Sequence, residues 1–249
     1  MAARRPGKGD GRARGFSRRQ PGGRGAPAPQ SGGVRRTIPP QGPFPSSGPA
    51  PVPAGPFRLG AAEGATPGKW IRIWDERMPR TPLELIPLPA SSGRSAIAAG
   101  TVDAGLVRLP IEREGLHVIP LYDEAPVVVM AAGSDLTAAD ELAASDLDGE
   151  VLIAPVDDVL SFTAAGATLP VFDPPETIAD AVALVAAGVG VLVVPMSLAR
   201  LHHRKDVTFR PLRDGPVSTM ALAWDAERTT ALVETFVGIV RGRTANSSR

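Results

Sequence analysis

The stretch Leu184-Val185-Ala186-Ala187-Gly188-Val189-Gly190-Val191-Leu192-Val193-Val194-Pro195 decides the class of fold. Just before it, Thr177-Ile178-Ala179-Asp180 has the form of a capping box, a hydroxyl followed three residues later by a carboxylate. The spacing predicts that a helix begins here and buries one apolar face. That face comprises Ile178, Ala181, Val182 and Val185.

The second half of the stretch predicts a turn, a strand and another helix. Gly188 can adopt the left-handed conformation that ends a helix. Val189–Val194 contains no polar side chain, which is typical of a strand buried on both faces. Pro195 ends that strand and suits the first turn of a helix over Met196–His202. Helix, glycine turn, buried strand and helix together form an α/β unit.

Composition limits the compartment and the chemistry. With 249 residues, 43% of them hydrophobic, the chain can bury one substantial core or two small ones. It has no cysteine, which excludes disulfides and thiolate chemistry. No run approaches 18 apolar residues, and the start of the chain lacks the apolar core of a signal peptide, so we expect a cytoplasmic protein with no membrane contact.

The charge is divided unevenly along the chain. Residues 1–57 contain ten Lys or Arg and a single acid, Asp10, whereas the remainder is mildly acidic. Residues 1–56 are poor in large apolar side chains, so we expect a disordered tail, basic at first and then Pro-rich. A basic arm that binds nucleic acid is one interpretation, and a solvated tail is the other. Residues 244–249 are expected to be disordered as well.

The remaining pattern alternates strands and helices. Strands are predicted at 57–62, 83–88, 102–110, 116–121, 126–131, 151–155, 207–212 and 217–224; helices at 67–78, 91–100, 137–144 and 227–241. The first part of this pattern, strand, helix, strand, helix and strand over residues 57–110 with short loops, implies a parallel sheet with right-handed crossovers. Residues 126–131 are predicted to cross into a second lobe, and 217–224 to return from it. The helix over 67–78 is predicted to bury Trp70, Ile71, Trp74 and Met78.

No catalytic or metal-binding motif is visible. The sequence has no Gly-rich phosphate loop, no Gly-x-Ser-x-Gly elbow and no metal-spaced cluster. Of the three histidines, His117 falls on a strand, and His202 and His203 are predicted to lie at a solvated helix end. We therefore expect a non-enzymatic protein with no cofactor.

Geometry nevertheless predicts a ligand site. In parallel α/β sheets, ligands bind outside the carboxyl ends of the strands. There the chain offers helix starts with free amides and hydroxyls, which suit a small carboxylate or similar anion. The candidate residues are Gly64, Ala65, Thr66, Ala90, Ser91, Ser92 and, closing from the second lobe, Thr177. The alternative is that the hydroxyls only cap helices, Ser91 or Ser92 capping the second one.

Four stretches carry a family resemblance: Phe57–Gly60, Gly100–Pro110, Leu121–Ala125 and Leu184–Pro195. In this order and spacing, they make the region from Phe57 to about Arg243 resemble the effector-binding domain of LysR-type transcriptional regulators. The resemblance implies an α/β, type 2 periplasmic-binding-protein-like fold, with two Rossmann-like lobes joined by a two-strand hinge and an effector between them. Lobe I would span about 57–127 plus 217–243, and lobe II about 128–216.

The resemblance also bears on the ligand and the partners. In members that respond to aromatic acids, a Ser or Thr in the first strand–helix loop and another at the second helix start hold the effector carboxylate. Here those positions read Gly64 or Ala65 followed by Thr66, and Ala90 followed by Ser91 and Ser92. Family members carry a winged helix-turn-helix before this domain, and nothing here resembles one, so we expect a stand-alone effector domain.

The leading interpretation is a ligand sensor that acts in transcription through a partner, as a homodimer or with a full-length LysR-type regulator. Three alternatives remain open: a DNA-binding regulator that uses the basic arm, an enzyme on the same bilobal fold, and a scaffold with a degenerate cleft.

Overall fold

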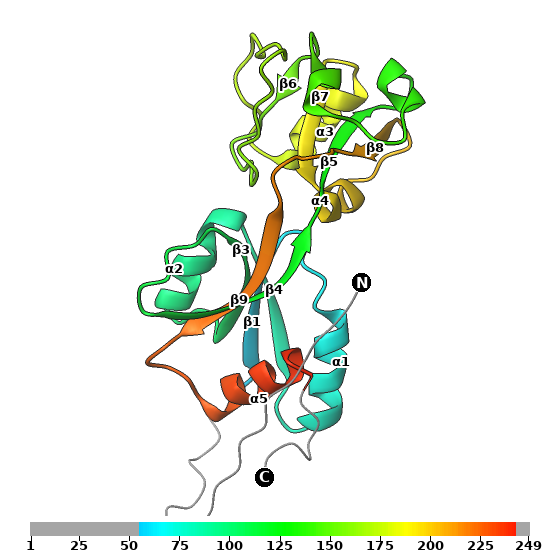
Figure 1. Cartoon of the computed structure of the whole chain (residues 1–249). Coiled ribbons are helices and arrows are strands. Elements are labelled where there is room, and N and C mark those ends of the chain that lie inside the picture. Colours follow the sequence, from blue (N-terminus) through cyan, green and yellow to red (C-terminus); the bar gives the residue numbers. More distant parts are fainter. Residues whose placement is uncertain (1–54, 243–249) are drawn as a thin grey trace, which may run out of the picture. The chain divides into compact units, whose positions relative to one another are not determined.

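The computed structural model describes residues 55–242 (Figure 1). The predicted basic, Pro-rich tail lies outside these residues except for its last two positions, as does the C-terminal stretch 244–249. Both therefore stay predictions.

Two mixed sheets organise the described part of the chain. In the first, with strand order β2-β1-β3-β9-β4, β1 runs parallel to β2 and β3, and β9 runs antiparallel to β3 and β4. Its strands are β1 (Phe57–Ala62), β2 (Leu83–Leu88), β3 (Ala104–Leu109), β4 (Leu116–Glu124) and β9 (Ser218–Asp225). The second sheet has the order β6-β7-β5-β8. Its strands are β5 (Pro126–Ala131), β6 (Leu152–Ile153), β7 (Val191–Pro195) and β8 (Val207–Pro211).

Helices cover both sheets. The α-helices are α1 (Gly68–Arg77), α2 (Gly93–Ala98), α3 (Ile178–Ala186), α4 (Met196–Leu201) and α5 (Ala231–Val240); the 3₁₀ turns are η1 (Ala90–Ser92), η2 (Asp135–Ala138) and η3 (Ala144–Leu147). Helices α1 and α5 pack on one face of the first sheet and α2 on the other. Helices α3 and α4 share a core with β5 and β7 of the second sheet. The predicted α/β architecture of two sheets is confirmed.

The chain crosses between the sheets twice. It leaves the first sheet where β4 ends at Glu124 and enters the second where β5 begins at Pro126. It returns between β8, which ends at Pro211, and β9, which begins at Ser218. The predicted crossing at 126–131 and the return at 217–224 therefore match β5 and β9.

The stretch that decides the fold behaves largely as predicted. The four residues of the predicted apolar face of α3 are buried, and the Thr177 hydroxyl accepts a hydrogen bond from the Asp180 amide. Gly188 has φ +76° and follows the helix end. Strand β7 begins at Val191, two residues later than predicted, because Gly190 still belongs to the turn, and Pro195 is the N-cap of α4.

The predicted helix over 137–144 is wrong. The chain forms only the 3₁₀ turns η2 and η3 here, because the backbone of Leu142 pairs with the residues at the end of β8. Its amide donates to the Pro211 carbonyl, its carbonyl accepts from the Arg213 amide, and its side chain is buried. A helix through Leu142 would break this pairing, so tertiary contacts override the local capping signal.

Two smaller expectations about helices also fail. Helix α1 buries Trp74 as predicted, with Trp70 and Met78 beside it, but Ile73 rather than Ile71 joins the core cluster. Neither serine provides a side-chain cap for α2. Ser91 lies within η1, and Ser92 occupies the N-cap position of α2, but its hydroxyl accepts no hydrogen bond from the helix.

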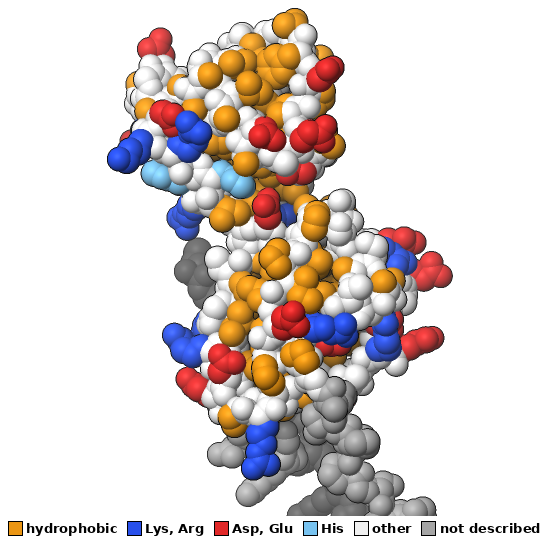
Figure 2. All heavy atoms as spheres, turned by 180° about the vertical axis from the view of Figure 1, so that it is seen from behind, with side chains coloured by type: hydrophobic (Ala, Val, Ile, Leu, Met, Phe, Trp, Pro, Cys, Tyr) orange, Lys and Arg blue, Asp and Glu red, His pale blue; other side chains and the backbone are white. Residues whose placement is uncertain are grey.

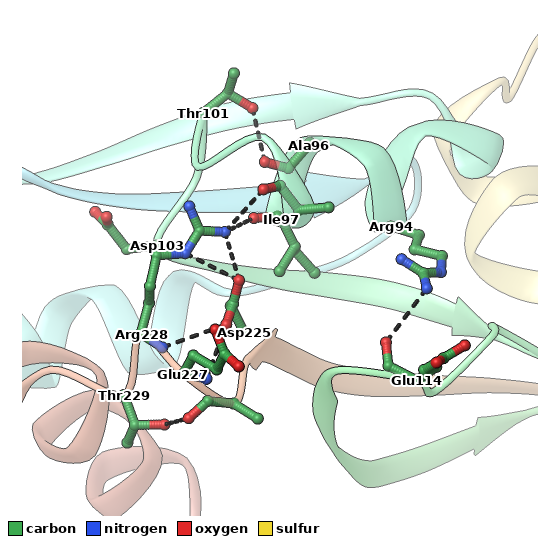
Figure 3. A network of polar contacts seen from close by, with 12 residues as sticks. Arg94, Ala96, Ile97, Thr101, Asp103, Glu114, Asp225, Glu227, Arg228 and Thr229 are labelled. Carbon is green, nitrogen blue, oxygen red and sulfur yellow. Dashed lines mark hydrogen bonds and ion pairs between the residues drawn. The ribbon is translucent and has the colours of Figure 1, made fainter.

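A polar network attaches the end of α2 to the turn before α5 (Figure 3). The Arg228 guanidinium donates to the carbonyl oxygens of Ile97 and Ala98, which are among the last carbonyls of α2. Asp225 orients the guanidinium by accepting from Nε at 2.9 Å. Because terminal helix carbonyls lack intrahelical donors, this arginine completes the C-terminus of α2.

Arg228→Met should lower the free energy of unfolding by about 1 kcal/mol, since it removes these capping hydrogen bonds. Urea unfolding measures the loss of stability. Hydrogen exchange should show that the substitution accelerates exchange of the α2 amides more than exchange of amides elsewhere in the protein. Arg200→Met is the matched control, because Arg200 is exposed and its side chain forms no hydrogen bond or ion pair within residues 55–242. Equal effects of the two substitutions would contradict the capping role.

Candidate functional site

A cavity of about 690 Å³ is lined by residues that come from both sheets and the helices on them. The first sheet and its loops contribute Glu63, Pro87, Leu88, Pro89, Ala90, Ser91, Arg108, Leu109 and Pro110. The second contributes Val156, Asp157, Asp158, Val159, Thr177, Ile178, Ala179, Leu198 and His202. Its volume and its mostly apolar lining with a few polar groups are typical of a small-molecule site.

The structure brings together three of the seven predicted ligand residues. Ala90, Ser91 and Thr177 line the cavity, at the turn after β2 and at the start of α3. The other four, Gly64, Ala65, Thr66 and Ser92, are not among the lining residues. The loop after β1 reaches the cavity through Glu63 instead.

The reason for this displacement lies in local packing. Gly64 has φ +80° and leaves no room for a side chain, because an added Cβ would lie 2.8 Å from the Arg108 guanidinium. Ala65 packs against the apolar core of the first sheet, and Thr66 is exposed. A ligand contact by these residues stays a prediction.

Thr177 is engaged by its own helix. Its hydroxyl accepts from the Asp180 amide at 3.1 Å and donates to Asp180 Oδ2 at 2.7 Å, which is the capping role offered as the alternative. The amides of Ile178 and Ala179 precede the first intrahelical bond and have no partner among the described residues. At this wall, backbone amides rather than the predicted hydroxyl are free for a ligand.

Arg108 is a central residue that the sequence analysis did not single out. Its side chain is only 5% exposed. Nη1 donates to Glu124 Oε2 at 2.5 Å and to Ser218 Oγ at 2.8 Å, and Nη2 donates to the Glu63 carbonyl at 2.9 Å and Ser197 Oγ at 3.1 Å. The guanidinium thus connects β3 with the end of β4, the start of β9, the loop after β1 and α4. The signal in the sequence was a lone cation inside an otherwise apolar strand.

The histidine prediction is half wrong. His203 is exposed as expected, but His202 lines the cavity, and its Nε2 is buried without a hydrogen-bond partner. That atom lies 3.9 Å from Glu63 Oε2, too far for a hydrogen bond. The adjacent Arg and Lys suggested a solvated helix end, and only the position of α4 brings the ring inward.

Acidic side chains also line the cavity. Asp157 and Asp158 follow β6, and Glu63 follows β1. Both carboxylate oxygens of Asp158 accept backbone amides, those of Leu160 and Ser161. Asp157 Oδ1, by contrast, is buried and has no partner within the described residues.

Tyr122 lies on β4 close to the Arg108–Glu124 pair. Burial raises the pKa of the Tyr122 phenol, and the negative charge of Glu124 raises it further, while a hydrogen bond with Thr66 and the charge of Arg108 act in the opposite direction. A raised phenol pKa means that the folded state favours the neutral form. Its contribution to stability is complete below the pKa of the unfolded chain and is lost as pH rises through the folded value.

Because Tyr122 is the single tyrosine of the chain, its ionisation can be followed by ultraviolet absorbance alone. We expect a midpoint above the ordinary value of 10.0 in the folded protein. Glu124→Gln should lower that midpoint, since it removes the charge that opposes phenolate formation. A midpoint at or below the ordinary value would show that the phenol is solvated.

Residues 55–242 hold no group of three or more His, Asp or Glu side chains placed to bind a metal ion. Within the same residues, no helix has the length and hydropathy needed to cross a bilayer.

One family model and one curated relative match most of the chain. A family model described as the LysR substrate binding domain matches residues 51–245. The Hca operon transcriptional activator HcaR of Escherichia coli K12 is 27% identical over 189 residues, which cover 72% of this chain and 63% of HcaR. The chain therefore spans under two thirds of this relative's length.

Solved structures share the fold. The reduced OxyR regulatory domain of Pseudomonas aeruginosa is similar with a TM-score of 0.60 and 25% identity, over 76% of this chain and 98% of that one. The BenM effector binding domain with its effector benzoate has a TM-score of 0.62 at 18% identity, over 78% of this chain and 96% of that one. The latter likeness concerns the fold alone.

Proposed function

Because the chain belongs to the LysR substrate-binding-domain family, we propose that it is a non-enzymatic sensor whose lobes bind a small metabolite and thereby affect transcription. The family has the type 2 periplasmic-binding-protein-like fold, and the two sheets are its two lobes. The assignment of 57–127 plus 217–243 to one lobe and 128–216 to the other belongs to this proposal. The cavity lined by both lobes is the observation that carries it.

The proposed ligand bears a carboxylate or similar anion. Three groups at the cavity support this: the Ser91 hydroxyl, which has no hydrogen-bond partner among the described residues, and the free amides of Ile178 and Ala179 at the start of α3. Helix α3 adds the partial positive charge of its N-terminus. The carboxylate effector of the BenM domain, benzoate, is consistent with the same chemistry.

Calorimetric titration with a panel of metabolite carboxylates tests the sensor directly. Ser91→Ala should weaken binding and leave the free energy of unfolding unchanged, because Ser91 caps no helix. Ser95→Ala on α2 is the matched control, since Ser95 does not line the cavity. No binding by any panel member would overturn the sensor proposal.

Thiol oxidation within these 249 residues cannot produce the signal, because they contain no cysteine. A ligand that contacts both lobes favours the arrangement in which both contacts are made, and its differential affinity limits the size of the change. We propose that this change is passed to a partner in the cytoplasm, either a second copy of the chain or a full-length regulator of the family. Measurement of the molar mass in solution, with and without ligand, tests whether the partner is a second copy of the chain.

A second candidate function rests on the ten basic residues of the segment 1–57. On the face that Figure 2 shows, charged side chains of the described residues are scattered and form no continuous basic patch. We propose the segment as the part of the chain that would bind DNA. This proposal predicts affinity that falls steeply with salt and is lost on deletion of residues 1–54. Binding that survives the deletion would exclude it.

A further inference from the structure

The charges that line the cavity do not balance. Three carboxylates, Glu63, Asp157 and Asp158, face it, together with Arg108 and His202. The positive charge of Arg108 is already matched by Glu124, at 2.5 Å and with both side chains at least 90% buried. No other Lys or Arg is among the lining residues. A purely anionic ligand would thus enter a site where negative charge is in excess.

Asp157 provides a second and independent observation. Its Oδ1 atom is buried, lies on a residue of the cavity lining, and accepts no hydrogen bond from the described residues. Leaving a carboxylate oxygen without donors is costly in a site shielded from solvent. Asp158, its neighbour, has both oxygens bonded to backbone amides, so the lack of donors is particular to Asp157. A donor on a molecule bound in the cavity would satisfy this oxygen.

The surroundings of Asp157 place it near the free amides. The Val156 amide donates to the Pro175 carbonyl at 2.9 Å, which holds the segment after β6 against the segment that leads into α3. The unpaired carboxylate and the two free amides of α3 therefore line the same cavity from adjoining segments. A ligand with a negative group for the free amides and a positive group for Asp157 matches this lining better than a simple acid does.

We propose that the ligand carries a positively charged nitrogen bound by Asp157, in addition to its acid group, and so is a zwitterion of the amino-acid type with an apolar body. This rests on the proposed sensor function and names the class of molecule sensed. Glu63 adds favourable potential for the nitrogen, and the buried Nε2 of His202 offers a further hydrogen bond. Apolar lining accommodates the body, from residues that include Leu88, Leu109, Val159 and Leu198.

Matched compounds separate the two charges of such a ligand. Calorimetry on the full chain would screen the standard amino acids. Two sets of compounds then test the contribution of the positively charged nitrogen while the apolar body stays the same. The first set is leucine, isocaproate and isoamylamine, and the second is phenylalanine, hydrocinnamate and phenethylamine. The amino acid of a set should bind about tenfold more tightly, or better, than its acid without nitrogen. Equal affinity of acid and amino acid would overturn the inference and leave the sensor proposal standing.

A substitution at Asp157 ties the effect to the proposed contact. Asp157→Asn should reduce amino-acid affinity by about tenfold or more, and it should not reduce the affinity for the matched acid, because it removes a negative charge from the cavity lining. Asp173→Asn is the control, because Asp173 is exposed and lies outside the cavity lining. Unchanged amino-acid affinity in Asp157→Asn would overturn the inference, as would the absence of any amino-acid binder. If the wider carboxylate panel also fails to bind, the sensor proposal falls with it.

Discussion

Arg108→Met is expected to lower the free energy of unfolding by about 3–5 kcal/mol. The substitution keeps an unbranched apolar side chain but removes the guanidinium, which leaves the Glu124 carboxylate, 10% exposed, without its cation. It also removes the donors that serve Ser197 and Ser218, one on each side of the crossing between the sheets. Urea unfolding followed by tryptophan fluorescence measures the loss.

The double variant Arg108→Met with Glu124→Leu separates the lost pair from the unpaired charge. Since both charges are then absent, the double variant should regain most of the stability that the single one loses. Arg58→Met is the control, because the Arg58–Asp103 pair is 37% and 30% exposed and its loss should cost below about 1 kcal/mol. If the double variant is as unstable as Arg108→Met, the desolvated Glu124 is not the cause.

Gly190→Ala is expected to destabilise the protein by about 3 kcal/mol, near the upper end of overpacking effects. An added Cβ would overlap the carbonyl oxygen of Val151 and lie 2.9 Å from its Cβ and 3.0 Å from its carbonyl carbon. These are mostly backbone atoms, and the same carbonyl accepts from the Val191 amide, so relief of the overlap would disturb the β6–β7 pairing.

Gly188→Ala is the natural comparison, two residues earlier. Gly188 has φ +76°, but an added Cβ would meet nothing within 4 Å. Only backbone strain opposes the alanine, so about 1 kcal/mol is expected. The two variants, measured by thermal unfolding under one condition, should differ clearly. A larger loss at Gly188 than at Gly190 would contradict the close approach of the strands.

The order and type of most elements could be predicted because they depend on local periodicity. Strands β1, β2 and β5 have the predicted bounds, and α3 buries its predicted face. Prediction failed over 137–144, where the backbone of Leu142 pairs with the end of β8. A capping signal contains no information about a strand some seventy residues later in the chain.

The candidate site was predicted in place but not in its chemistry. The rule that ligands bind beyond the carboxyl ends of strands predicted Ala90 and Ser91 as ligand residues, and both line the cavity. It did not indicate that Arg108, His202 and Asp157 would join them. Each of these comes from a different element, and nothing in the spacing of charged residues says which of them become neighbours.

By itself, the sequence determined that the chain is α/β, that Gly188 ends a helix, and that a buried strand lies within the run predicted over Val189–Val194, because side-chain periodicity and a glycine's tolerance of positive φ are local properties. Only the tertiary structure decided that Gly190 must lack a side chain, that Arg108 is neutralised by Glu124, and that Asp157 Oδ1 finds no donor in the part of the chain that the structure describes. These facts depend on which strands become neighbours. Close approach, burial and unmet hydrogen bonds arise between segments far apart in the chain.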